Sequence, residues 1–129
     1  MPHFLSPLLR SPDAAHLLRN ERTGQTIATA IEPAFESAAR RRGLLGRDAM
    51  RPGSALVIAP CSSVHTWFMR FPIDIVFAAR DGRVLKVRRH VAPWRLAGAM
   101  GAFAVIELPG GSLDASALVA GDALQIVSA

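Results

Sequence analysis

The chain has 129 residues, a length that fits one domain with one hydrophobic core. Half of its residues are hydrophobic, and 15 basic against 10 acidic side chains give a formal net charge of +5. The longest strongly apolar run, residues 96–106, contains two glycines and is too short to span a bilayer. We therefore expect a single globular domain over residues 1–129 that has no membrane partner.

The cysteine content and the N-terminus bear on the compartment. Cys61 is the only cysteine, which excludes an internal disulfide and a Cys-rich zinc site. Residues 1–13 lack the basic start and apolar block of a secretory signal, and we expect them to form a poorly ordered N-terminal arm. These features favour a cytoplasmic protein with no disulfide-linked partner.

The positive charge does not by itself indicate a nucleic-acid partner. Basic residues are scattered along the chain, apart from clusters at residues 40–42 and 88–90. Single-strand binders interleave such groups with exposed aromatic side chains, whereas this chain has no tyrosine and most of its aromatics sit in apolar runs. A solvated basic face is the favoured interpretation, and nucleic acid is disfavoured as a partner.

The first half of the chain predicts a hairpin and a helix. Residues 15–20 and 25–31 flank the sequence ERTG, a short glycine-containing link that is typical of a β-hairpin. Pro33 suits the first turn of a helix, the sequence AFESAARRR follows it, and Gly43 suits a C-terminal cap. This pattern predicts one helix of about ten residues.

The second half predicts strands almost throughout. Apolar runs of strand length recur, and Asp81-Gly82 between two of them is a strong hairpin signal. Both faces of these strands are substantially apolar, so several strands need cover on both sides. We expect a mainly β fold, either a small closed barrel or a two-sheet sandwich of about seven or eight strands with one short α-helix. The strands after the helix are expected near residues 54–60, 64–69, 73–79, 84–89, 102–108 and 123–127.

Several separate blocks resemble a known family. They are RRRGLLGR, PCSSVHTWFMRFPIDIVF, DGRVLKV, APWR and VIELPGGSLDASALVAGDAL, in that order. Together they resemble the uncharacterised bacterial and archaeal family called domain of unknown function 192, over residues 14–127. The resemblance implies a small, mainly β, barrel-like domain and brings no established activity with it.

The stretch Pro60–Phe77 gathers the most reactive side chains. Cys61 and His65 are about 13 Å apart along an extended strand, so they do not form a local nucleophile-base pair. His65, Trp67 and Met69 would share one face of that strand. Cys61, His65 and Met69 are chemically suitable copper ligands, but their spacing matches no known metal motif. We therefore predict no metal and no cofactor.

The turn near Pro72 leaves two alternatives for Asp74. If the chain turns there, residues 73–77 return beside residues 64–69, and Asp74 forms an ion pair with Arg70. If a long strand kinks at Pro72 instead, Asp74 swings towards His65 as its orienting carboxylate. The sequence leaves both arrangements open.

Two further segments offer candidate ligand-binding groups. Glu107 ends an apolar strand before a Pro-Gly-Gly turn, so it either caps the amides of the turn or faces a cavity where burial raises its pKa. Trp94 and Arg95 follow Pro93 in a loop, and the pair suits a sugar ring or a carboxylate. The alternative is a tryptophan lid over the core with the arginine in solvent.

Three functions remain as hypotheses. The first is a non-catalytic domain that binds a small polar molecule in a pocket at the barrel mouth, lined by His65, Trp67, Asp74, Trp94, Arg95 and Glu107. The second is a hydrolytic or metal-assisted enzyme that uses His65 with Asp74 or Glu107, although no known catalytic template is present. The third is a basic interaction or scaffold domain whose helix, with Arg40 to Arg42, docks an acidic partner. We rank them in that order.

Overall fold

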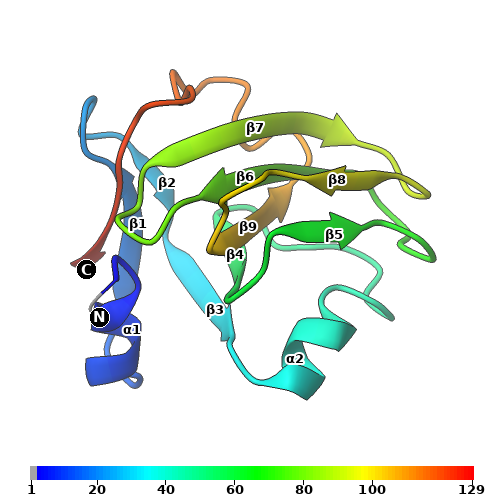
Figure 1. Ribbon diagram of the computed structural model, residues 1–129, viewed down its shortest axis with the longest axis horizontal. Coiled ribbons are helices and arrows are strands. Elements are labelled where there is room, and N and C mark those ends of the chain that lie inside the picture. Colours follow the sequence, from blue (N-terminus) through cyan, green and yellow to red (C-terminus); the bar gives the residue numbers. More distant parts are fainter. Residues whose placement is uncertain (1–2) are drawn as a thin grey trace.

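Strands are the main regular elements of a computed structural model of the protein, which describes residues 3–129 (Figure 1). The described residues form ten strands and two short helices. The strands are β1 His16–Asn20, β2 Thr26–Ala28, β3 Ala30–Ala34, β4 Ser54–Ile58, β5 Ser63–His65, β6 Ile73–Ala78, β7 Val84–Val91, β8 Leu96–Gly98, β9 Ala104–Pro109 and β10 Leu124–Ser128. The helices are α1 Ser6–Arg10 and α2 Ser37–Arg42.

The strands form three sheets. A five-stranded sheet has the order β3-β4-β9-β6-β7, a three-stranded sheet has the order β10-β1-β2, and β5 pairs with β8 alone. The mainly β prediction is confirmed. Of the two expected forms, the closed barrel is not formed by residues 3–129, because β3 and β7 remain as the two edges of the five-stranded sheet, and the two-sheet sandwich stays a prediction. The described residues also contain more elements than the seven or eight strands and one helix that were expected.

The core lies on both faces of the five-stranded sheet. Its three central strands, β4, β6 and β9, are buried at nearly every position, as their continuous apolar sequences require. Side chains of one face pack with Leu18 and Ile126 of the three-stranded sheet. Side chains of the other face pack with Leu44 and Met69, and with Ala97 of β8. The sheet is therefore a middle layer with cover on each side.

The N-terminal segment differs from the expected arm. Residues 6–10 form α1, and Leu5 and Leu8 are buried in the first core. A short helix becomes stable here because Leu8, together with Leu5 at its N-cap, removes apolar surface from water. The part of the expected arm that the structure describes is helical over residues 6–10, and its first two residues lie outside the described residues. No helix among residues 3–129 is long and apolar enough to cross a membrane.

The hairpin predictions are confirmed, whereas the helix begins later than expected. β1 pairs with β2, and β6 pairs with β7 around Asp81-Gly82. Gly82 has φ +91°, and a Cβ there would lie 2.5 Å from the carbonyl oxygen of Leu124. Pro33, expected in the helix, instead lies in the edge strand β3, which tolerates its missing N–H. α2 begins at Ser37 and ends at Arg42, with Gly43 as its C-terminal cap as predicted, so it is shorter than the expected ten residues.

The expected strand 64–69 is mostly a turn. β5 ends at His65, and the amide of Met69 donates to the carbonyl of Thr66 at 3.2 Å. Because β5 pairs with β8 while β6 pairs with β7 and β9, the expected return of residues 73–77 beside 64–69 is wrong. His65, Trp67 and Met69 therefore do not share the face of one strand.

Candidate functional site

Asp74 takes neither of the two expected positions. Its side chain is fully buried and accepts hydrogen bonds from the backbone amides of His90 at 2.8 Å, Gly111 at 3.2 Å and Leu113 at 2.9 Å. Arg70 instead pairs with Asp48 on the surface. The left-handed backbone of His90, with φ +52°, interrupts the β6-β7 pairing, whose register shifts between Ile73 and Ile75. Asp74 is thus a structural residue that fixes the segment after β9.

A cleft of about 200 Å³ lies between α2 and the five-stranded sheet. Its walls are the C-terminal half of α2 with the turn that follows and the segment around β5, while β4 and β9 contribute single residues. The lining comprises residues 40–45, Ile58, Cys61, residues 63–65, Met69 and Glu107. Of the residues predicted for a pocket, His65 and Glu107 meet here.

Glu107 is the buried acid of the cleft. It lies in the middle of the sheet, opposite Leu56 of β4 and Ile75 of β6, and only 3% of its surface is exposed. Burial raises its pKa to about 7, an effect that the charge of Arg47 partly opposes. No group in residues 3–129 donates a hydrogen bond to its carboxyl or forms an ion pair with it. Buried carboxyls normally have such partners, so Glu107 retains its full capacity to accept hydrogen bonds.

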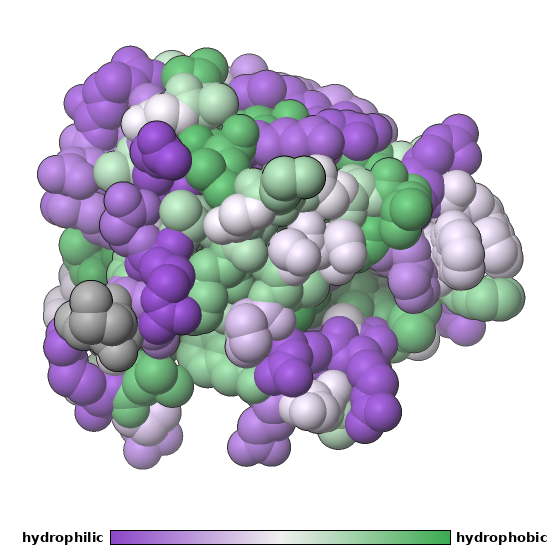
Figure 2. Space-filling view, viewed as in Figure 1, coloured by the Kyte–Doolittle hydropathy of each residue, from purple (hydrophilic) through white to green (hydrophobic). Residues whose placement is uncertain are grey.

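Arginines form the rim of the cleft. Arg40, Arg41 and Arg42 occupy the last turn of α2, where cations also interact favourably with the helix dipole. The guanidinium of Arg40 donates to the carbonyl of Phe35 and to the hydroxyl of Ser37. Figure 2 shows these hydrophilic side chains gathered along the lower edge, over α2. The rim therefore carries a positive charge above a buried acid.

The sulfur-containing side chains and His65 also line the cleft. Cys61, His65 and Met69, the candidate copper ligands, all contribute to its wall. Within residues 3–129, however, no three side chains of His, Cys, Asp or Glu are grouped so that they hold a metal ion. The thiol of Cys61 donates to the carbonyl of Ser63 at 3.1 Å, and burial raises its pKa. A protonated thiol of this kind is a poor nucleophile.

His65 does not form a dyad with either candidate carboxylate. In the described chain no hydrogen bond joins it to Asp74 or to Glu107, and Asp74 is occupied by backbone amides. The ring of His65 instead lies 5.0 Å from that of Trp67, tilted by 32°. The direct contact that would make His65 an acid-base partner of either carboxylate is thus not present among the described residues.

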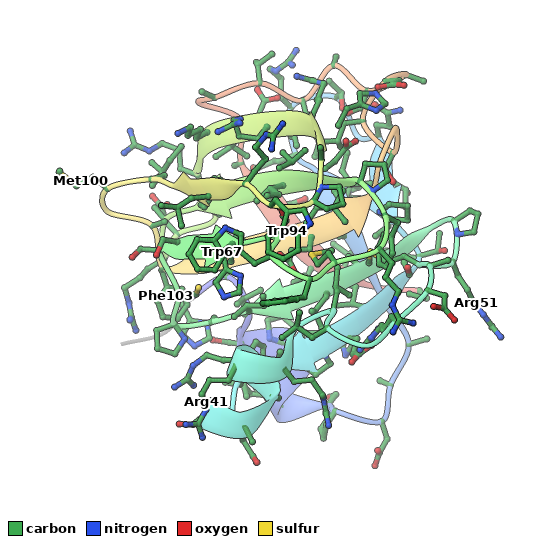
Figure 3. All side chains as sticks on the ribbon, turned by 90° about the vertical axis from the view of Figure 1, so that its right-hand side faces the viewer. Arg41, Arg51, Trp67, Trp94, Met100 and Phe103 are labelled. Atoms are coloured by element: carbon green, nitrogen blue, oxygen red, sulfur yellow. The ribbon has the colours of Figure 1, made fainter. Side chains whose placement is uncertain are left out.

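An exposed aromatic surface, which we define as Trp67, Phe68 and Trp94, adjoins the cleft through His65. Their exposed fractions are 47%, 69% and 56%. The rings of Phe68 and Trp94 lie 4.7 Å apart in an edge-to-face arrangement. Figure 3 places Trp67 and Trp94 next to one another at the end of the molecule that faces the viewer. One of the two roles expected for Trp94 was a lid over the core. Its exposed side chain does not fit that role.

Thr66 holds the two loops of this surface together. Its buried hydroxyl donates to the carbonyl of Ala92 at 2.7 Å and accepts from the amide of Arg95 at 2.8 Å. Its backbone amide donates to the carbonyl of Arg95 at 2.8 Å, and its carbonyl accepts from the amide of Trp94 at 3.0 Å. The sequence analysis did not predict a role for Thr66. The one sequence feature that could have indicated it is the position of Thr66 next to His65 in the block PCSSVHTWFMRFPIDIVF, which resembles the family.

The backbone of the aromatic surface is strained. Phe68 and Trp94 have φ angles of +63° and +68°, in the left-handed region that bulky residues avoid. Each such residue costs on the order of 1–3 kcal/mol, and the surrounding hydrogen bonds must hold it in place. The guanidinium of Arg95 folds back to the carbonyls of Pro93 and Trp94, at 3.5 and 3.3 Å. Strain of this kind concentrates at functional sites.

Comparison with solved structures finds the same fold in two bacterial proteins. One, from Sinorhizobium meliloti 1021, bears the name "putative transcription regulator"; it is 21% identical with a TM-score of 0.74, over 86% of this chain and 91% of that chain. The other, a protein of unknown function from Novosphingobium aromaticivorans DSM 12444, is 22% identical with a TM-score of 0.73, over 86% of this chain and 83% of that chain. At these identities the likeness extends to the fold alone.

Sequence comparison gives the family. No curated protein of known function matches the chain. The model of one family, described as "Uncharacterized ACR", matches residues 18–126, which is most of the chain and includes the cleft and the aromatic surface. The chain therefore belongs to the family DUF192, as the blocks in its sequence predicted.

Proposed function

We propose that this protein is a non-catalytic domain that binds a small polar molecule in the cleft beneath α2. The observation that carries the proposal is Glu107, a buried carboxyl that lines the cleft and has no hydrogen-bonding partner in the described chain. The carboxyl opens on the cleft, and a ligand that supplies a donor there satisfies it. Glu107 therefore acts as the group that selects the ligand.

The cleft specifies two features of the ligand. Glu107 requires a hydroxyl or amine that donates to a carboxylate, while Arg40 to Arg42 at the rim favour an anionic group. A volume of about 200 Å³ limits the part of the ligand inside the cleft to a few heavy atoms. The best match is a small molecule with a hydroxyl next to a carboxylate.

Binding is a better account of this site than catalysis. The raised pKa of the Cys61 thiol disfavours nucleophilic attack, and His65 lacks a carboxylate to orient it. Both residues then serve as cleft wall. The position of Arg40 to Arg42 along the lining of a cleft also favours a small ligand over a docked protein.

An NMR titration tests the proposal with three probes. Glycolate carries both a hydroxyl and a carboxylate, acetate lacks the hydroxyl, and ethylene glycol lacks the carboxylate. At pH 8, where most of Glu107 is ionised, we expect glycolate to shift the amide signals of residues 40–45 and 61–65 at lower concentration than either other probe.

The variant Glu107→Gln tests whether the carboxylate of Glu107 itself binds the ligand, rather than the overall charge of the protein. It keeps the shape of the side chain, and we expect it to bind glycolate about tenfold more weakly, the value of one charge-assisted hydrogen bond. Glu21→Gln, at an exposed position, is the matched control and should bind as the unchanged protein does. Equal binding of glycolate by the Glu107→Gln protein, or no response to any probe, would contradict the proposal.

A further inference from the structure

We propose that the aromatic surface is the second half of this site and that the ligand is an acidic saccharide. Its sugar ring lies on Trp67 and Trp94, its carboxylate lies among the arginines of α2, and a ring hydroxyl donates to Glu107. This inference rests on the proposed function, because it extends the same cleft.

The aromatic surface and the cleft are continuous. His65 lines the cleft, and its ring lies 5.0 Å from the ring of Trp67. Trp94 is tied to the same segment through the carbonyl of Thr66. In Figure 3 the two tryptophans lie above α2, from which Arg41 projects. A ligand of one or two rings therefore reaches from the cleft to the aromatic surface.

The aromatic surface is held in a fixed position before any ligand arrives. Thr66 joins its two loops by four hydrogen bonds of 2.7–3.0 Å. These bonds keep Phe68 and Trp94 in left-handed backbone conformations that point large rings into solvent. Loops fixed in this way lose little backbone entropy on binding, which favours a preformed binding surface.

The geometry of the rings excludes a base held between two parallel rings and leaves single ring faces open to a sugar. Planar bases stack face to face on aromatic side chains. Here Phe68 meets Trp94 edge to face at 61°, so the two rings do not form a parallel slot. A sugar ring needs only one exposed indole face for its C–H groups, and its hydroxyls remain available to Arg95 and to solvent.

The charges of the site favour a sugar that carries a carboxylate. A neutral sugar leaves the arginines of the rim without an anion to bind, whereas a phosphate dianion brings two charges close to the buried Glu107. A sugar acid presents one negative charge to the rim and hydroxyl donors to the buried carboxyl. It is the ligand class that matches all three parts of the site.

Methyl β-D-glucuronide tests the inference against matched probes. Methyl β-D-glucoside lacks only the carboxylate, and uridine monophosphate offers a nucleobase and a phosphate instead. The chain has two tryptophans, and both belong to the aromatic surface, so its two indole N–H signals report directly on binding there. We expect the glucuronide to shift both indole signals and the amides of residues 40–45, with an affinity at least tenfold above those of the other two probes.

Variants of the exposed rings separate the two halves of the site. Trp67→Ala and Trp94→Ala should each weaken glucuronide binding about tenfold while glycolate binding is retained. Phe68→Gly serves as a folding check, because glycine adopts φ +63° without strain. Val119→Ala, at an exposed apolar position outside the surface, is the matched control and should leave binding unchanged.

The outcomes distinguish this inference from the proposed function. If glycolate binds but the glucuronide leaves both indole signals unmoved, the saccharide inference fails and the small-ligand cleft stands. Tighter binding of uridine monophosphate, or unchanged glucuronide affinity in both tryptophan variants, also overturns the inference. If neither glycolate nor the glucuronide shifts residues 40–45, both proposals fail.

Discussion

Two buried carboxyls on adjacent strands of one sheet have opposite environments. Asp74 of β6 accepts hydrogen bonds from three backbone amides, whereas Glu107 of β9 accepts none from the described chain. The carboxyl of Asp74 is occupied by hydrogen bonds within the fold, and the carboxyl of Glu107 is available to a ligand. This difference in hydrogen bonding, rather than burial alone, separates the structural acid from the proposed binding group.

Sequence reasoning was informative for Glu107 and wrong for Asp74. Of its two expected roles, a carboxyl that faces a cavity and has its pKa raised by burial matches the structure, whereas a cap on the amides of the turn does not. The partners of Asp74 are His90, Gly111 and Leu113, which lie 16, 37 and 39 residues away. A search among nearby charges considered Arg70 and His65 only, so it could not find backbone amides that the fold brings from a distance.

Asp74→Asn tests the structural role at the residue scale. An amide side chain keeps one acceptor oxygen but turns an NH₂ group towards buried N–H donors, leaving at least one of them unpaired. We expect the free energy of unfolding to fall by about 1–3 kcal/mol, measured by urea denaturation. Asp48→Asn, which breaks only the exposed pair with Arg70, should change it by less than about 1 kcal/mol. If the two substitutions lowered the free energy of unfolding equally, the hydrogen bonds of Asp74 to the three backbone amides would not stabilise the fold as proposed.

At the scale of elements, the strands predicted from the sequence were confirmed where they are buried in the core and were wrong in the segment after β5. The central strands β4, β6 and β9 were predicted because a continuous apolar run needs no knowledge of its partners. The segment after β5 was mistaken for strand because Phe68 adopts a left-handed conformation without being glycine or asparagine. Its turn is imposed by hydrogen bonds to Thr66 from distant residues, which no local pattern encodes.

The helix α1 gives a second prediction, at the element scale. Five residues are too few for a helix to be stable alone, so α1 depends on the burial of Leu5 and Leu8. Leu5→Ala should lower the free energy of unfolding by about 2–5 kcal/mol, measured by thermal or urea denaturation. The comparison is Leu9→Ala on the same helix, where the side chain is 56% exposed and the loss should be below about 1 kcal/mol. A loss at Leu5 as small as that at Leu9 would mean that α1 does not pack on the core.

At the scale of the whole molecule, the sequence predicted the class but not the arrangement. Strand content and the need for cover on both faces follow from composition and pattern. The order of the five-stranded sheet and the separate β5-β8 pair depend on contacts between distant segments. The cleft is a product of that arrangement, since α2, β5 and β9 meet only in the folded chain. The sequence predicted His65 and Glu107 as candidate site residues. It could not predict that both line one cleft together with Arg40 to Arg42.

The unpartnered state of Glu107 has a consequence for the stability of the whole protein. Burial raises its pKa from 4.5 to about 7, so the folded protein binds this proton more tightly than the unfolded chain does. Between these two values, stability therefore falls as the pH rises, and the loss is complete only above the folded pKa. Glu107→Gln cannot ionise, so it should lack this contribution to the pH dependence.

The free energy of unfolding of the unchanged protein and of Glu107→Gln, measured by urea denaturation at pH 5 and pH 8, is the most direct test. We expect the unchanged protein to lose about 2–3 kcal/mol relative to the variant between these two pH values. A difference between the two proteins that stays constant with pH would mean that Glu107 is already paired or solvated. That result would contradict the claim that a buried carboxyl without a partner forms the centre of the ligand site.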